Sequence, residues 1–93
     1  MRVISNKSLR EFAELYPDAD FPLQGWRKLM EHACPRSYAD LKKLSNSVDR
    51  VGNYYIFDIS GNKYRVIAAI HFDRQMIYVR HVFTHVEYNS WGP

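Results

Sequence analysis

The sequence predicts an α+β fold, with helices packed on one face of a mostly antiparallel sheet. Three observations carry this prediction. In the first half of the chain apolar residues recur at helical spacing, whereas from Tyr54 onward they recur at every second position. A Gly61-Asn62 turn signal separates two of the alternating runs. The length of 93 residues supports one hydrophobic core, so we expect residues 1–93 to form a single domain.

The chain opens with a short strand and an amphipathic helix. Residues 1–5 read as a β-type run, after which Ser5 or Asn6 is placed to cap a helix. Over residues 8–16 the apolar positions follow the i, i+3, i+4, i+7 pattern of a helix face: Leu9, Phe12, Ala13 and Tyr16. Pro17 ends this helix because proline cannot continue the backbone hydrogen bonding.

Two further helical segments precede the sheet. A second helix is predicted to begin near Asp20, and Pro35 closes that segment. The pair Ser37 and Asp40 resembles a capping box with Asp in place of Glu. It would open a short third helix through Leu44. We therefore expect two or three helices before the meander begins.

The second half of the chain predicts a polar loop and then a three-stranded antiparallel meander. Residues 45–53 are polar and irregular, and we interpret them as the loop. The three strands are expected over residues 54–60, 63–72 and 76–83. Gly61-Asn62 should form a two-residue turn between the first pair, because both residues tolerate positive φ.

Alternation sorts the strand side chains into two faces. The more apolar sets should meet the helices: Tyr64, Val66, Ala68, Ile70 and Phe72 on one strand, and Ile77, Val79, His81 and Phe83 on the next. The face turned away from the helices, called the outer face below, should then carry Lys63, Arg65, Tyr78 and Arg80, with His71 near the far hairpin. On this interpretation His81 is a partly buried histidine with no catalytic part.

The cations of the outer face favour an anionic ligand. Lys63, Arg65 and Arg80 on neighbouring strands repel one another unless an anion lies between them. The planar guanidinium matches phosphate geometry, so the pattern indicates a phosphate-binding surface. The alternative is a solvated sheet face whose cations pair with Asp58 or remain hydrated.

The segment that follows the last strand adds groups able to transfer protons. Thr84 and Glu87 match the capping box S/T-x-x-E, so the strand should end there and a short helical turn should begin. His85 and Tyr88 then lie three residues apart on one side of that turn. The free N–H groups of the turn would suit phosphate, and a histidine there can act as acid or base near neutral pH.

Composition limits the class of protein. The net charge of +3 and the pI of about 9.1 permit a polyanionic partner without requiring one. A single cysteine, Cys34, excludes an intramolecular disulfide and fits a reducing compartment. The sequence contains neither an apolar run long enough to span a membrane nor a signal-peptide core, so we expect a cytoplasmic protein that does not enter membranes.

No metal or other cofactor is expected. A site formed by His71, His81 and His85 would require side chains that strand geometry points apart, and the chain has neither an HExxH motif nor a pair of cysteines.

Three stretches of the sequence resemble the HigB family of bacterial toxins. They are GNKYRVIAAIHF at 61–72, MIYVRHVFTHVEY at 76–88, and the opening MRVIS…LREFAELYPDAD…PLQGWRKLM. The most specific positions are 61–65, Arg80, and Thr84 to Tyr88. Asn89 departs from the pattern, since similar sequences often carry Asp at this point.

The resemblance implies a RelE-like fold and an mRNA interferase, the toxin of a type II toxin–antitoxin system. Such toxins are endoribonucleases that cleave mRNA, typically in the ribosomal A site, and a HigA-type antitoxin with a helix-turn-helix region neutralises them. Cleavage without metal needs a base for the ribose 2′-OH, cations for the phosphate and an acid for the leaving 5′-oxygen. The candidate catalytic residues are Arg65, Arg80, His85 and Tyr88, and the candidate RNA-binding residues are Lys63, Tyr78 and His71.

Two other classes of function fit the same residues. One is a binding module for RNA or the ribosome without catalysis, such as a toxin paralogue that has lost activity. The other is a ribonuclease that acts on free RNA.

Overall fold

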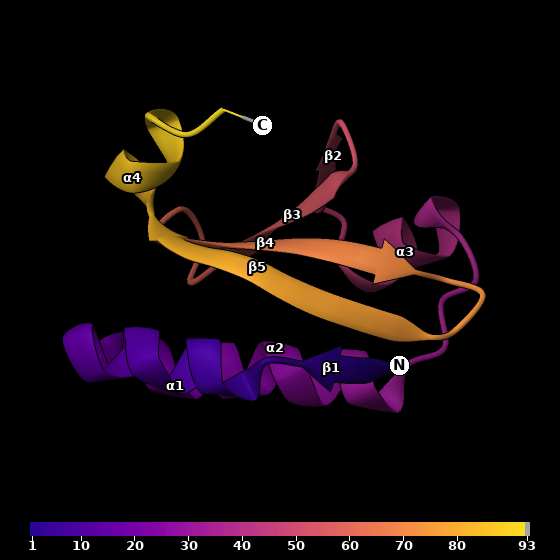
Figure 1. Cartoon of the computed structure of the whole chain (residues 1–93), viewed down its shortest axis with the longest axis horizontal. Coiled ribbons are helices and arrows are strands. Elements are labelled where there is room, and N and C mark those ends of the chain that lie inside the picture. The colour runs from indigo at the N-terminus through magenta and orange to yellow at the C-terminus, as the bar shows by residue number, and fades with distance from the viewer. Residues whose placement is uncertain (93) are drawn as a thin grey trace.

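Helices α1 and α2 lie together on one side of a five-stranded sheet, and α4 lies on the other side, beyond the end of β5 (Figure 1). The structure is a computed structural model and describes residues 1–92. Its elements are β1 (Arg2–Ile4), α1 (Asn6–Leu15), the 3-10 turn η1 (Pro17–Ala19), α2 (Asp20–His32), α3 (Tyr38–Leu44), β2 (Asp49–Val51), β3 (Tyr54–Ile59), β4 (Tyr64–His71), β5 (Met76–Thr84) and α4 (His85–Asn89). The predicted α+β class and order of elements are confirmed.

The sheet has more strands than the predicted meander. Its order is β1-β5-β4-β3-β2, with β1 parallel to β5 and every other pair antiparallel. The interpretation of residues 45–53 as loop was wrong, because β2 lies within it and pairs with β3 across a turn at Gly52. A three-residue strand is too short for alternation to reveal it.

The β3–β4 hairpin has a longer loop than the two residues predicted. Ile59 pairs with Tyr64, so residues 60–63 form the loop. Positive φ is found at Ser60 (53°) and Gly61 (65°). With this loop length the paired residues Ile59 and Tyr64 both face the core. Lys63 then lies in the loop and not in β4.

The predicted helix starts are correct in position but differ in capping. Ser5 precedes α1 in the left-handed region, at φ 81°, and its side chain makes no capping hydrogen bond. Ser37 does cap α3, accepting a hydrogen bond from the backbone N–H of Asp40 at 3.2 Å. The Asp40 carboxylate accepts from the N–H of Arg36 at 3.0 Å, one residue before the position a capping box requires.

The core lies between the sheet and the pair α1 and α2. Its most buried side chains come from both layers: Leu9, Leu23 and Met30 from the helices, and Phe57, Val66, Ala68 and Ile77 from the strands. Full burial of one such aliphatic or aromatic side chain is worth about 1.5–3 kcal/mol. The predicted apolar face of β4 is confirmed, and it fixes which face remains for function.

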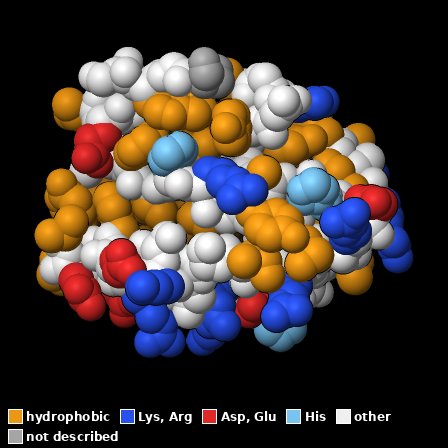
Figure 2. Space-filling model, in the orientation of Figure 1, with side chains coloured by type: hydrophobic (Ala, Val, Ile, Leu, Met, Phe, Trp, Pro, Cys, Tyr) orange, Lys and Arg blue, Asp and Glu red, His pale blue; other side chains and the backbone are white. Residues whose placement is uncertain are grey.

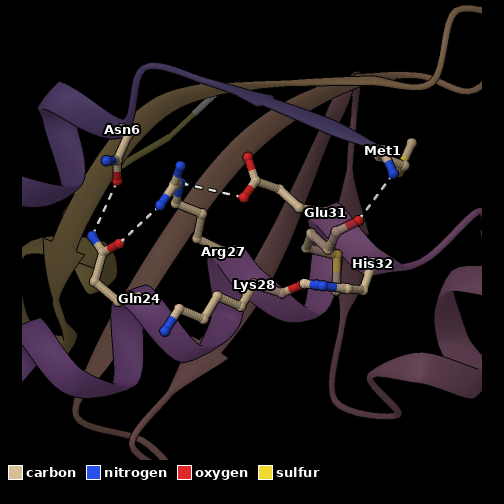
Figure 3. Close-up of polar contacts among 8 residues, drawn as sticks. Met1, Asn6, Gln24, Arg27, Lys28, Glu31 and His32 are labelled. Atoms are coloured by element: carbon tan, nitrogen blue, oxygen red, sulfur yellow. Dashed lines mark hydrogen bonds and ion pairs between the residues drawn. The ribbon is translucent and has the colours of Figure 1, made fainter.

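Polar contacts along α2 hold β1 and α1 against it (Figure 3). Gln24 donates to the side-chain carbonyl of Asn6 at 3.0 Å, and Arg27 lies 3.6 Å from Glu31. The amino group of Met1 donates to the Met30 carbonyl at 3.1 Å, near the C-terminal end of the helix. The first strand is therefore anchored beside β5 by contacts that do not involve the outer face.

A β-bulge in β5 exchanges the two faces of that strand after Val79. The register with β4 shifts by one residue there, and Arg80 has no partner in β4. The predicted orientation of His81 and Phe83 toward the helices is wrong. Val82 packs against the core instead, and His81 and Phe83 lie on the outer face. A single extra residue on one strand reverses the alternation of everything that follows it.

Candidate active site

The outer face of β4 and β5 is partly aromatic and partly cationic. Its side chains, read from the register, are Arg65, Ile67, Ala69 and His71 from β4 and Met76, Tyr78, His81 and Phe83 from β5. Figure 2 shows Lys or Arg and His side chains among hydrophobic ones across the middle of the molecule, where β5 runs, while the visible Asp and Glu lie toward its edges.

Trp91, which follows α4, closes one end of the outer face. Its ring lies 5.6 Å from that of Tyr54, 6.3 Å from Phe83, 6.0 Å from His81 and 6.1 Å from Tyr88, measured between centroids. These contacts hold α4 over the ends of β4 and β5. The side chains of α4 are thereby fixed beside Arg65.

Arg65 is the buried centre of this end of the sheet, with 7% of its surface exposed. Its Nε lies 3.0 Å from the Asp58 carboxylate. Its Nη1 donates to the Tyr64 carbonyl at 3.1 Å, and its Nη2 donates to Asn62 at 3.1 Å and to Nδ1 of His85 at 3.3 Å. These contacts occupy all but one of the guanidinium N–H groups.

The charge of Arg65 is therefore largely compensated within the protein. Asp58 lies directly opposite it in the β3–β4 register, so the pairing with Asp58 that was considered as an alternative is present. The residual attraction for a phosphate is weaker than a free arginine would exert. What the arrangement provides instead is rigid placement, because a guanidinium held at several points has lost its rotational freedom.

The sequence predicts His85 and Tyr88 beside Arg80, whereas in the structure they lie beside Arg65. Thr84 and Glu87 form the complete capping box, with the Glu87 N–H donating to the Thr84 hydroxyl at 3.2 Å and the Glu87 carboxylate accepting from the Thr84 N–H at 2.8 Å. This fixes α4, so that the Tyr88 ring lies under the guanidinium of Arg65, 5.5 Å from its central carbon. A cation, an imidazole and a phenol are brought together.

The start of α4 offers less to an anion than expected. The N–H of His85 already donates to the Lys63 carbonyl at 3.1 Å, and that of Glu87 is taken by the capping box. The Glu87 carboxylate also lies at this end. The first turn of α4 is thus engaged in positioning His85.

Lys63 does not lie beside Arg65 on the outer face, which corrects the prediction. Because it belongs to the hairpin loop, its ammonium reaches toward the helical layer and pairs with Asp18 of η1. The Tyr64 hydroxyl donates to the same carboxylate at 2.6 Å.

These contacts shift the pKa values of all three groups. Hydrogen bonds from Lys63 and Tyr64 lower the pKa of Asp18. The hydrogen bond to Asp18 raises the pKa of Lys63, and it also raises that of Tyr64, to which burial adds. We call this trio the Asp18 clamp.

Arg80, Tyr78 and His71 form a separate group further along β5. The Arg80 guanidinium lies over the Tyr78 ring at 5.3 Å, and the rings of His71 and Tyr78 meet edge to face at 5.4 Å. Arg80 precedes Thr84 by four residues, a distance of about 13 Å along a strand. No contact among the described residues joins it to Arg65, so the structure does not place the two arginines on one phosphate.

His81 is exposed on the outer face, not partly buried on the core side. It stacks on Phe83 with 5.1 Å between ring centroids and 10° between planes. His81 therefore lies on the surface between the group around Arg65 and the group around Arg80.

Comparison with known proteins places the chain in a family. A family model described as HigB_toxin, RelE-like toxic component of a toxin-antitoxin system, matches residues 19–91. The chain belongs to the HigB toxin family. It is 32% identical over 92 residues to the mRNA interferase toxin HigB of Escherichia coli strain K12, covering 96% of this chain and 88% of that protein. The mRNA interferase HigB of Escherichia coli O6:H1 is 26% identical over 93 residues, covering 97% and 90%.

Membership of the HigB family confirms the resemblance seen in the sequence. As the toxic component of a toxin–antitoxin system, a HigB toxin has an antitoxin as its partner. The matched range contains Arg65, His85 and Tyr88 and begins one residue after Asp18, so the Asp18 clamp lies across its boundary.

Sequence reasoning missed two residues that contact the central groups, Asn62 and Asn89, and it gave Asp58 only as an alternative ion-pair partner of the cations. Asp58 and Asn62 hold Arg65, and Asn89 lies with its side-chain amide 3.3 Å from Nε2 of His85. Asn89 had a usable signal, because it follows His85 by four residues on the same helical turn. Asn62 had none, since it was assigned to the turn for its conformation alone.

Neither a metal centre nor a membrane span is found in the part of the chain that the structure describes. No three His, Cys, Asp or Glu side chains of residues 1–92 are grouped so that they could hold a metal ion. None of the helices in that range has the length and apolar character needed to cross a membrane.

Proposed function

We propose that this HigB-family chain is an endoribonuclease that cleaves mRNA and is held inactive by its antitoxin. The relatives are mRNA interferases by name. The observation that carries the proposal is the contact of Arg65 with Nδ1 of His85 at 3.3 Å, above the ring of Tyr88. This set can supply a fixed cation and two proton-transfer groups at one point of the surface.

The chemistry would be attack by a ribose 2′-OH on the adjacent phosphorus. A base removes the 2′-OH proton as the new P–O bond forms, and the bond from phosphorus to the 5′-oxygen breaks. An acid gives a proton to that leaving oxygen, which produces a 2′,3′-cyclic phosphate and a free 5′-OH. His85 and Tyr88 are the candidates for the two transfers, and Arg65 stabilises the charge that builds on the phosphate. No step of this sequence requires a metal or another cofactor.

The rest of the outer face would hold the RNA on either side of the cut. Tyr78 and His71 offer rings for stacking of unpaired bases, and the exposed Arg80 offers a charge to the backbone. The task of Arg80 is then binding and positioning of a neighbouring phosphate. Lys63 can join them only by leaving Asp18.

We further propose the setting in which this enzyme acts. Residues 1–93 work as one domain in the cytoplasm, on mRNA that occupies the ribosome, and the partner is a HigA-type antitoxin. The two alternatives are a ribonuclease that acts on free RNA and a binding module without catalysis. One experiment distinguishes both of them from the proposed function.

That experiment is induction of the chain in a bacterial host, with and without the antitoxin reading frame. Primer extension on several transcripts should show new ends inside translated regions and none in untranslated RNA. His85→Ala and Tyr88→Phe should reduce the cuts by about 100-fold or more, and Arg80→Ala should weaken RNA binding with a smaller loss at saturating RNA. Arrested growth with intact transcripts would assign the chain to the non-catalytic class, and cuts in untranslated RNA would exclude dependence on the ribosome.

A further inference from the structure

The His85 ring has a donor group on both of its nitrogens. Nδ1 lies 3.3 Å from Nη2 of Arg65, and Nε2 lies 3.3 Å from the side-chain nitrogen of Asn89. A neutral imidazole has one nitrogen that accepts and one that donates, and an imidazolium has two that donate. Both contacts as they stand are therefore incompatible with any protonation state of the ring.

Only one of the two partners can change its role. The guanidinium of Arg65 has no acceptor and does not lose its proton, so Nδ1 must be the accepting nitrogen. The proton of His85 is then on Nε2. Turning the Asn89 carboxamide by 180° about its last side-chain bond brings its oxygen to the place of its nitrogen, because the two ends have nearly the same shape. Asn89 then accepts from Nε2.

We propose that Asn89 is a positioning residue for the cleavage reaction, holding the His85 proton on Nε2 so that Nδ1 keeps its lone pair, which accepts the Arg65 N–H in the free protein and takes the 2′-OH proton once that N–H turns to the phosphate. This inference rests on the proposed function and deepens it, because it makes His85 the base that activates the 2′-OH. The base is oriented by a third group through its other nitrogen, as such bases generally are. The contact between Asn89 and Nε2 would tighten when RNA is bound.

An amide differs from a carboxylate in this place. The Asn89 side-chain oxygen accepts a hydrogen bond from Nε2–H without adding the charge that would favour the imidazolium form. The other ionisable groups around the ring come from several elements: Arg65 of β4, with Asp58 behind it, Lys63 and Asp18 of the clamp, Tyr64, and Glu87 and Tyr88 of α4. Of these only Arg65 touches a ring nitrogen.

The first test reads the tautomer itself by nitrogen-15 NMR of the ring nitrogens in the folded chain. The His85 signals are identified by their loss in His85→Gln. Above the pH at which the ring titrates, the protein should show a single form with the proton on Nε2, and in Asn89→Ala a fraction with the proton on Nδ1 should appear, because the contact with Arg65 alone then selects between the two forms. In Asn89→Asp the single form should persist and its titration midpoint should rise by about one pH unit. Asn46→Ala, whose side chain has no hydrogen bond among the described residues, is the matched control and should leave the spectrum unchanged.

The second test reads the reaction with a short RNA over a range of pH. Asn89→Ala should lower kcat about 10-fold with little change in KM, and Asn89→Asp should move the acidic limb of kcat/KM upward by about one pH unit. A proton on Nδ1, or an Asn89→Ala spectrum like that of the unchanged protein, would overturn the inference. An unchanged pH profile in Asn89→Asp would overturn it as well. If the NMR result holds and the unchanged protein does not cut RNA, the assignment of the tautomer stands and the proposed function fails.

Discussion

Substitution of either member of the Arg65–Asp58 pair should lower the free energy of unfolding more than substitution of any exposed residue of the site. The perturbation is a cycle of Arg65→Ala, Asp58→Ala and the double variant. Arg65 is 7% exposed and its Nε lies 3.0 Å from the Asp58 carboxylate, whose side chain is 29% exposed. Removal of one member leaves the other charge without a partner in a place that water reaches poorly.

The size of the effect follows from this burial. Breaking a fully buried ion pair costs about 3–5 kcal/mol. The partial exposure of Asp58 reduces this, so we expect a loss in free energy of unfolding of about 3 kcal/mol for Arg65→Ala and about 2 kcal/mol for Asp58→Ala. The double variant should lose about 3 kcal/mol, since the second change removes the stranded charge, and the coupling is then about 2 kcal/mol. Arg65→Ala alone should lower the Tm by about 12–24 °C in a chain of this size.

The assay is urea unfolding followed by far-ultraviolet circular dichroism. Each variant is produced with the antitoxin, separated from it in guanidinium chloride and refolded, which avoids selection against active protein. Arg10→Ala, an exposed arginine of α1, is the matched control and should change stability by less than about 0.5 kcal/mol. Two single variants that each lose under about 1 kcal/mol, or a double variant equal to their sum, would show that the pair is not coupled as the geometry requires.

Three further results are expected. His81→Ala should change the free energy of unfolding by less than about 0.5 kcal/mol, because the bulge leaves this side chain exposed. A loss above about 2 kcal/mol would show that His81 is buried in the core. Asp18→Asn should flatten the dependence of the urea midpoint on pH at both ends. The lowered pKa of Asp18 gives stability that is present above its ordinary value of 3.8 and is lost as the pH falls through the folded value. The raised pKa values of Lys63 and Tyr64 give stability that is present below their ordinary 10.5 and 10.0 and is lost as the pH rises further. A curve for Asp18→Asn that overlays that of the unchanged protein would refute the clamp. A zinc-selective chelator at fixed Mg²⁺ should not alter the rate of RNA cleavage, and a loss that added zinc restores would contradict the metal-free mechanism.

The sequence predicted those parts of the fold and site that depend on local chemistry. The alternation of β4 identified its core face, and the Thr84–Glu87 capping box predicted the turn that brings His85 and Tyr88 together. Both signals lie within a few residues and need no knowledge of the rest of the chain. They were enough to find two of the groups around the central arginine, His85 and Tyr88.

The parts that were wrong depend on pairing between distant residues. Lys63 was assigned to a strand face, but its partner Asp18 is 45 residues earlier in the chain. The bulge at Arg80 was hidden because Val79, Val82 and Phe83 allow an apolar face in either phase. Only the register against β4 decides between the two.

The bulge separates two properties of position 80 that a sequence comparison treats as one. The extra residue lies outside the ladder and offsets the faces beyond it by one position in the sequence, while the arginine supplies a charge. Substitution of Arg80 removes the charge and keeps the phase, so that Tyr78 and His81 continue to share the outer face although an odd number of steps separates them. Deletion of the residue would remove the bulge and leave the faces as they are, because Val79, His81 and Val82 would then alternate regularly against the same partners in β4. A relative that lacks the extra residue would therefore keep the same faces, and a one-residue gap aligned away from position 80 would exchange buried and exposed positions between the gap and the bulge.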